Sequence, residues 1–167
     1  PLCMIPAPGT KMKKRIITTV IFLAALVLVS CIMVQVNHSG RVSSNGKRLG
    51  EALKQVNKTE ITWDEVVPFE WDTMYCFTPY TSKETMVQTV GFDSRFLQAG
   101  EYDDMVNLLF VKDQEVVAAV YGHGADLGYR LSAGEKVKKG DGTKFAVEKK
   151  GQEIYFSEKE VADRLKR

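Results

Sequence analysis

The sequence contains little cysteine and histidine, with three Cys and two His among 167 residues. Cys3 and Cys31 lie before or within an N-terminal apolar run, so the rest of the chain contains Cys76 alone. An internal disulfide framework is therefore excluded, and we expect Cys76 to be a small buried hydrophobic residue. A zinc site needs three or four ligands, so the sequence predicts no metal centre and no other cofactor.

Signatures of catalysis and phosphate binding are also missing. The chain has no G-x-S-x-G, no phosphate-binding loop, no H-E-x-x-H and no C-x-x-C. These short patterns place nucleophiles, metal ligands or phosphate groups for chemistry. Their absence makes a protein without enzymatic activity the favoured hypothesis.

Acidic residues are absent before Glu51, which makes the overall charge misleading. The whole chain carries 23 Lys and Arg against 21 Asp and Glu, a net charge of +2. Four of the basic residues precede the apolar run, which leaves 19 basic and 21 acidic side chains beyond it, a net charge of −2. Nucleic-acid binding needs a dense basic surface, so we expect no nucleic-acid partner.

Residues 12–36 are predicted to be a signal peptide or a membrane anchor, and residues 1–11 are interpreted as upstream sequence. The segment begins with Met and a basic stretch, continues as an apolar run and contains LVSC at 28–31. This arrangement resembles a bacterial lipoprotein signal with its lipobox. The resemblance implies cleavage after Ser30 and acylation of the Cys31 thiol.

A second interpretation of the same segment is an uncleaved single-pass helix. The chain stays apolar after Cys31, where lipoproteins turn polar, and Ile16 to Val36 is 21 residues long. About 20 apolar residues are needed to cross a bilayer. Under both interpretations the preceding basic residues hold the N-terminus in the cytoplasm. The domain is then expected at the cell membrane, on its extracytoplasmic side.

Beyond the run, residues 37–46 are rich in Ser, Gly and Asn and are predicted to form a flexible spacer. Residues 47–167 are then the extracytoplasmic domain. Apolar residues recur at helical spacing over 47–57, which predicts a helix with Ser44 or Asn45 as its N-cap.

The stretch Trp71–Phe92 organises the predicted domain. Its first half alternates as a strand covered on both faces, and the strand should end at Pro79, which has no backbone donor. Thr81 and Glu84 then form a capping box that opens a helix. Gly91 suits the left-handed residue that closes it.

After this stretch, two pairs of apolar segments predict hairpins. They are 106–111 with 115–121 and 143–148 with 153–156. Ser157 and Glu160 make a second capping box, which predicts a terminal helix. The order of these elements predicts an α+β fold. We expect a four- to five-stranded antiparallel sheet with packed helices, preceded by the N-terminal hydrophobic helix.

His123 is the one candidate for catalysis that the sequence offers. Gly122 and Gly124 flank it, and Asp126 follows at a distance that would let its carboxylate orient the imidazole. The alternative hypothesis for function is therefore a small envelope hydrolase or transferase that uses His123 and Asp126. The simpler interpretation is an ordinary loop residue, because one histidine is weak evidence for a site.

Basic residues gather near the last predicted hairpin. They are Lys136, Lys138, Lys139, Lys144, Lys149 and Lys150. Such a cluster is expected to be a solvated turn. The alternative is a contact with anionic lipid or an anionic envelope polymer.

The pattern Trp71-Asp72, Tyr75-x-Phe77 and Pro79-Tyr80-Thr81, followed by the first hairpin, resembles small membrane-anchored proteins and lipoproteins of Gram-positive bacteria with no assigned function. The resemblance covers roughly residues 63–156. It implies a fold and a location, and no catalytic residue can be carried over from it. Together these observations predict a membrane-tethered binding or accessory module of the cell envelope, with an envelope protein as a possible partner.

Overall fold

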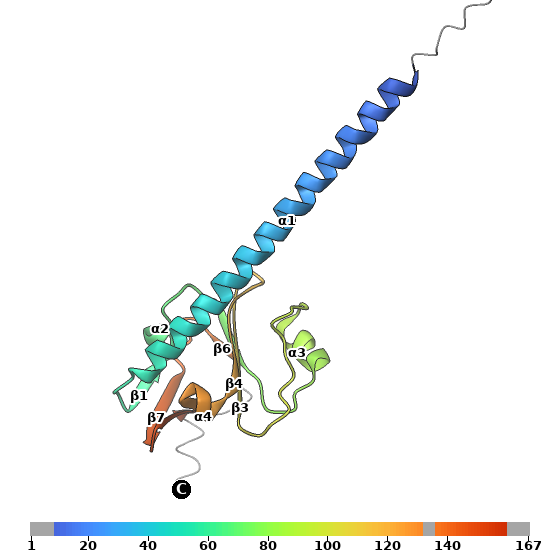
Figure 1. Cartoon of the computed structure of the whole chain (residues 1–167). Helices are drawn as coiled ribbons and strands as arrows, with labels where there is room; N and C mark the ends of the chain where they lie inside the picture. Colours follow the sequence, from blue (N-terminus) through green and yellow to red (C-terminus); the bar gives the residue numbers. More distant parts are fainter. Residues whose placement is uncertain (1–8, 132–135, 160–167) are drawn as a thin grey trace, which may run out of the picture. The chain divides into compact units, whose positions relative to one another are not determined.

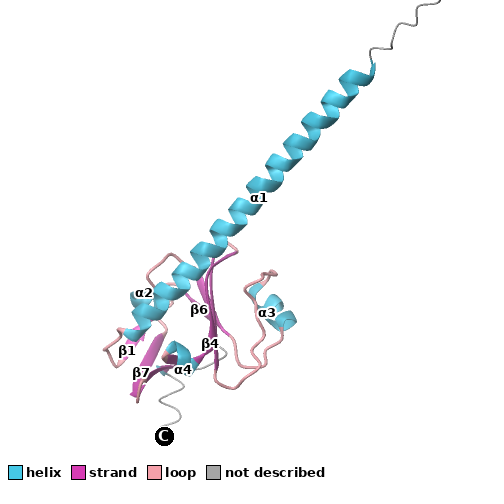
Figure 2. Ribbon diagram, in the orientation of Figure 1, coloured by secondary structure: helices cyan, strands magenta, loops and turns pink. Residues whose placement is uncertain are grey.

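The structure is a computed structural model that describes residues 9–131 and 136–159. The chain divides into two compact units, residues 1–40 and residues 41–167. Helix α1 (Gly9–Lys54) belongs to both units, and the described strands all lie in the second (Figure 1, Figure 2). The predicted α+β class with a hydrophobic N-terminal helix is confirmed.

The apolar residues 16–36 lie within α1 and leave their large side chains exposed all around the helix. At a rise of about 1.5 Å per residue this stretch is about 31 Å long, close to the roughly 30 Å of a bilayer's hydrocarbon core. The hydroxyls of Thr19 and Ser30 donate to backbone carbonyls of the preceding turn, so they need no water. The segment is consistent with a signal sequence or a single membrane span.

The prediction of a flexible spacer at 37–46 is wrong, because α1 continues through these residues without a break. The reason is burial in the second unit. Val42 is 2% exposed, and Leu49 and Leu53 are fully buried. Ser, Gly and Asn have weak helix propensities, which cost free energy in a helix. The burial of these apolar side chains stabilises the helix by a larger amount.

The predicted N-cap at Ser44 or Asn45 is also wrong, because the helix does not begin there. Asn45 has another use, since its side-chain amide donates to the carbonyl of Val117 at 2.9 Å. At Gly46 an added Cβ would lie 2.6 Å from the carbonyl oxygen of Ala119. This part of α1 therefore packs against the free edge of a strand, and Asn45 pairs one of the carbonyl groups on that edge.

Eight strands in the described residues form two four-stranded sheets. The first sheet, in the order β1-β7-β8-β5, contains Glu60–Thr62, Lys144–Lys150, Glu153–Glu158 and Tyr129–Leu131. The central sheet, in the order β4-β3-β2-β6, contains Glu115–His123, Met105–Lys112, Thr73–Cys76 and Lys136–Lys138. The central sheet is antiparallel, whereas β5 pairs with β8 in parallel. The sequence predicts one sheet, whereas the described strands form two. The alternation of apolar and polar residues along a strand indicates which face is buried, but it does not indicate which sheet the strand joins.

Both predicted hairpins are confirmed, as β3 with β4 and β7 with β8. The first turns through Asp113 and Gln114, whose φ angles are 49° and 61°. Two successive residues at positive φ match the twist of a tight hairpin. The carboxylate of Asp72 accepts a hydrogen bond from the Asp113 amide at 2.9 Å and holds this turn.

Helix α3 (Lys83–Val90) follows β2 as predicted, but its N-terminal cap lies one residue later than expected. The Ser82 hydroxyl accepts a hydrogen bond from the Thr85 amide at 3.2 Å. The predicted capping box of Thr81 and Glu84 does not form, because the Thr81 hydroxyl donates to the carbonyl of Thr78 at 2.8 Å. That bond belongs to the turn that leaves the strand.

At the other end of α3, Gly91 takes the predicted left-handed conformation, with φ of 94°. The second predicted capping box, of Ser157 and Glu160, is only partly described by the structure. Ser157 lies inside β8, while Glu160 and the terminal helix predicted after it lie outside the described residues. Two short helices, α2 (Trp63–Val66) and α4 (Gly124–Leu127), complete the described elements.

The central sheet is covered on both faces. One face packs against the first sheet and the end of α1, with Phe110, Met74 and Leu108 fully buried there. The other face packs against α3 and the loop after it, around Met86 and Leu109. Figure 1 shows α3 on one side of this sheet and β1 and β7 on the other. Cys76, on β2, is 5% exposed as predicted.

Candidate functional site

His123 is the last residue of β4 and bonds to a different carboxylate from the one expected. Its Nδ1 lies 2.8 Å from Oδ1 of Asp104. The sequence placed Asp126 in this role, but Asp126 lies on α4 and lines a separate hollow beside α1. The reason is the register of the hairpin, which pairs Met105 with His123 and so brings Asp104 beside the imidazole.

The Asp104–His123 pair is half-exposed, with 35% and 43% of the two side chains accessible. The hydrogen bond from His123 lowers the pKa of the Asp104 carboxyl. The backbone of Asp104 is also held, because its carbonyl accepts from the Gly124 amide at 3.0 Å. A base with an orienting carboxylate is one element of hydrolytic sites. In the described residues, however, no Ser, Thr or Cys hydroxyl or thiol is bonded to His123.

A second charged pair lies close to the first. Arg130 Nε donates to Glu153 Oε2 at 2.6 Å, and the Tyr155 hydroxyl donates to the same oxygen at 2.9 Å. These bonds lower the pKa of Glu153, the one from Arg130 having the larger effect. Gly124 leaves room for this arrangement, since a Cβ there would lie 2.6 Å from Cγ of Arg130.

Three exposed tyrosines surround the same corner of the molecule. Tyr80 is 64% exposed, Tyr102 57% and Tyr121 38%, and no other large hydrophobic side chain is exposed among the described residues beyond α1. All three belong to or contact the loop 99–104. The ring of Tyr102 lies 5.3 Å from that of His123, and the Tyr121 hydroxyl donates to the carbonyl of Ala99 at 2.9 Å. We call these three residues and the loop the tyrosine surface.

Tyr80 is held in an unusual backbone conformation, with φ of 65°. A left-handed residue other than Gly, Asn or Asp is uncommon and strained. Its amide donates to the carbonyl of Gly100 at 2.8 Å, which fixes it against the loop. Partial burial, with the charge of Asp103 second, raises the pKa of its phenol. Sequence reasoning used Tyr80 only as part of a packing pattern and missed its exposure.

The predicted lysine cluster is divided between the two sheets, on or beside β6 and β7. Several of its members bond to carboxylates, as Lys139 does to Glu70 at 3.2 Å and Lys144 to Glu60 at 2.7 Å. Lys136 lies over the ring of Tyr75, with Nζ 5.2 Å from the centroid. Such pairing is what a solvated surface shows, and binding of an anionic polymer stays a prediction without support from this geometry.

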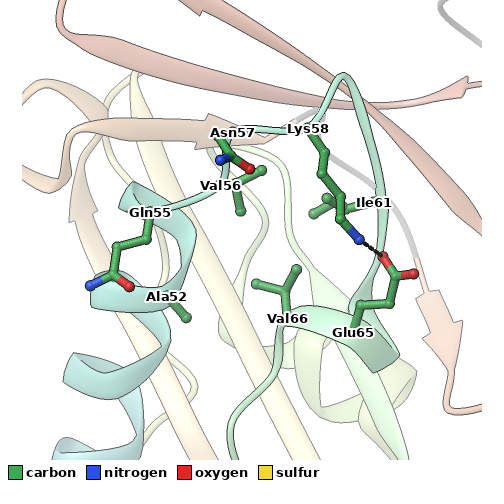
Figure 3. A pocket seen from close by; sticks show the side chains of 8 residues that line it. All are labelled: Ala52, Gln55, Val56, Asn57, Lys58, Ile61, Glu65 and Val66. Atoms are coloured by element: carbon green, nitrogen blue, oxygen red, sulfur yellow. Dashed lines mark hydrogen bonds and ion pairs between the residues drawn. The ribbon is translucent and has the colours of Figure 1, made fainter.

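Figure 3 shows a hollow of about 270 Å³ where α1 ends and the chain passes into β1 and α2. Its apolar side is formed by Val56, Ile61 and Val66. Lys58 reaches Glu65 across it at 3.4 Å (Figure 3). Because these two charges satisfy one another, the hollow presents no unpaired charged group to a ligand.

The remaining predicted site residue is Cys31, which is exposed and unpaired within the apolar part of α1. Within the residues that the structure describes, no group of three or more His, Cys, Asp and Glu side chains could hold a metal ion. No protein-family model, curated protein or solved structure matches this chain. The likeness to membrane-anchored proteins of Gram-positive bacteria therefore stays a prediction.

Proposed function

We propose that the protein is a membrane-tethered domain, held on the extracytoplasmic side by residues 16–36, that acts by binding an envelope component. The observation that carries this proposal is the apolar part of α1. Its large apolar side chains are exposed on all sides, and no charged residue interrupts the segment. A helix that is apolar all round needs an apolar solvent. Basic residues precede it, which favours a cytoplasmic N-terminus.

Two forms of tether follow from the same segment, and α1 supports the single span over the lipoprotein. The helix continues past Cys31 through five more apolar or amide side chains and then directly into the domain. A lipoprotein needs no helix at this point, because the lipid alone anchors it.

The intact mass of the protein extracted from the membranes of a bacterial host tests the tether, with Cys31→Ala beside the wild type. A single span gives an unmodified mass that retains residues 12–30 in both. A product that starts at Cys31 and carries added lipid mass, absent from the variant, would replace the span by a lipid anchor. Recovery of both proteins from the soluble fraction would reject the tether altogether.

The tyrosine surface supports binding as the activity. Tyrosine rings present a large contact area with few rotatable bonds, and they are enriched where proteins bind one another. The carboxylates of Glu101, Asp103 and Asp104 lie in the same loop. This composition suits a partner surface with basic side chains.

A photo-crosslinking residue in place of Tyr102 tests this surface, with the same residue in place of exposed Lys149 on β7 as the matched control. We expect one dominant crosslinked protein from position 102 and none from position 149. The same products from both positions would show that the tyrosine surface is not specific.

The second candidate is an envelope hydrolase or transferase, and the Asp104–His123 geometry is the observation in its favour. Asp104 would orient the imidazole in place of Asp126. Replacing His123 with Ala tests it in a strain that depends on the protein. An unchanged phenotype rejects the enzyme, whereas loss of function with Asp104→Asn and not with Asp126→Asn would favour it.

A further inference from the structure

A hollow of about 420 Å³ lies between the domain part of α1 and the strand β4. We call it the α1–β4 hollow. Its walls are the helix face around Gly46 and Gly50, the β4 residues Ala119 and Val120, and α4. Its volume lies within the range of about 300–1,000 Å³ that small-molecule sites occupy.

The two glycines of this helix face differ in the space around them. At Gly46 a side chain would collide with the backbone of Ala119, so packing requires glycine. At Gly50 a Cβ would meet only the Tyr129 ring and hydroxyl, at 3.8 and 3.6 Å, which is ordinary contact. Glycine inside a helix is about 1 kcal/mol less favourable than alanine. Packing does not explain Gly50, and its effect is to leave the space before Tyr129 open.

Tyr129 offers a hydrogen bond that the protein does not use. The residue is 1% exposed and lines the hollow. Its hydroxyl has no hydrogen-bond partner among the described residues. Burial raises the pKa of this phenol to about 12, so the hydroxyl stays protonated and can donate. The one buried side-chain polar atom without a partner in the described residues is Trp63 Nε1, so the Tyr129 hydroxyl is open to the hollow and can donate to a ligand there.

The charged side chains around the hollow are of both signs. Lys47, Glu51 and Lys54 lie on the same face of α1, and Asp126 faces them from α4. None of the four forms an ion pair with a described residue. The Lys54 side chain passes close to Gly128, since its Cε would lie 3.2 Å from a Cβ added there. A ligand with one cationic and one anionic end would complement these charges.

We infer that the α1–β4 hollow binds a small zwitterion with a free amino group and a free carboxylate, of the size of a dipeptide. The carboxylate accepts from the Tyr129 hydroxyl and lies near Lys47 and Lys54. The amino group lies near Glu51 or Asp126. The apolar side chains of Val120 and Leu127 contact the ligand between its two ends.

Calorimetric titration of the full chain in detergent micelles tests this inference. The probes are L-alanyl-L-alanine, free L-alanine, and N-acetyl-L-alanyl-L-alanine amide, which lacks both charges. We expect saturable binding of the dipeptide and at least tenfold weaker binding of the blocked peptide. Free alanine distinguishes a peptide site from an amino-acid site. No saturable binding of either charged probe, or equal binding of charged and blocked peptide, would overturn the inference.

Three variants locate the binding. Gly50→Leu fills the hollow and should abolish it, whereas Gly40→Leu, where nothing lies within 4 Å of an added Cβ, should not. Tyr129→Phe removes a hydroxyl with no protein partner and should weaken binding about tenfold, the value of one hydrogen bond, while the urea midpoint stays unchanged. Wild-type binding by Gly50→Leu would place the ligand elsewhere. The result is independent of the tether and of the tyrosine surface.

Discussion

Helix α1 contains two regions with the same backbone and opposite burial. Over 16–36 the side chains are apolar all round, and each large one is more than half exposed. Over 41–54 apolar residues form a single stripe, and Val42, Leu49 and Leu53 are buried in it. An amphipathic stripe is buried when one neighbouring surface covers it, whereas a helix that is apolar all round needs an apolar environment on every side. The comparison shows that one continuous helix contains both an exposed apolar segment, consistent with a signal sequence or a single membrane span, and a core element of the domain.

The largest expected effect concerns the burial of this stripe. Leu53→Ala should lower the free energy of unfolding by about 2–5 kcal/mol, because it leaves a cavity in the core. Leu26→Ala, in the exposed apolar part, should leave it unchanged. Urea unfolding in detergent micelles measures this through Trp63 and Trp71, which are 1% and 2% exposed in the domain. Equal losses in both variants would remove the distinction between the two regions.

A smaller effect is expected from two glycines of the same helix. Gly46→Ala should destabilise the domain by about 1–3 kcal/mol, because the new methyl group meets the Ala119 backbone and overpacks the contact. Gly40→Ala has open space around it and should not destabilise the domain, since alanine is the better helix former. The same unfolding measurement compares them. A stabilising Gly46→Ala would mean that α1 does not approach β4 so closely.

The smallest expected effect is a difference in response to acid. Residues 16–37 contain no Asp, Glu, Lys, Arg or His, so retention in the membrane should not change with pH. In the domain, hydrogen bonds from Lys144 and Lys159 lower the pKa of Glu60 from 4.5 to about 2. Because the folded-state pKa is the lower one, this stabilisation is present above pH 4.5 and is lost as pH falls toward 2.

Carboxyl NMR titration of Glu60 measures that pKa directly. Lys144→Met should raise it toward the ordinary value and make domain stability less dependent on pH between about 5 and 2. Lys149→Met, on the same strand, should leave it unchanged. A Glu60 pKa near 4.5 in the wild type would show that the ion pair has no effect in solution.

Local sequence patterns predict the structure correctly where neighbouring residues decide the outcome. The hairpins, the left-handed Gly91 and the burial of Cys76 depend on alternation, turn chemistry and residue type. The capping box at Thr81 failed by one residue, because two adjacent hydroxyls compete for the same role and only the path of the turn selects Ser82.

The candidate site was found only in part. The flanking glycines indicate His123 as a candidate, but its partner lies across the hairpin and not further along the chain. The predicted strands 106–111 and 115–121 already contained the better answer, since a tight turn brings the residues before one strand beside those after the other. The exposure of Tyr80 and Tyr121 had no signal in the sequence, because tyrosines are as common in cores as on surfaces.

The sequence by itself determined the apolar segment, the α+β class and the strands that form hairpins, because these depend on hydrophobic periodicity and turn residues close together in the chain. Tertiary structure alone decided that 37–46 is helical, that eight described strands form two sheets, and that Tyr129 faces an open hollow beside Gly50. Each of these depends on contacts between residues far apart in the chain. Burial at such contacts supplies more free energy than the local preferences that it overrides.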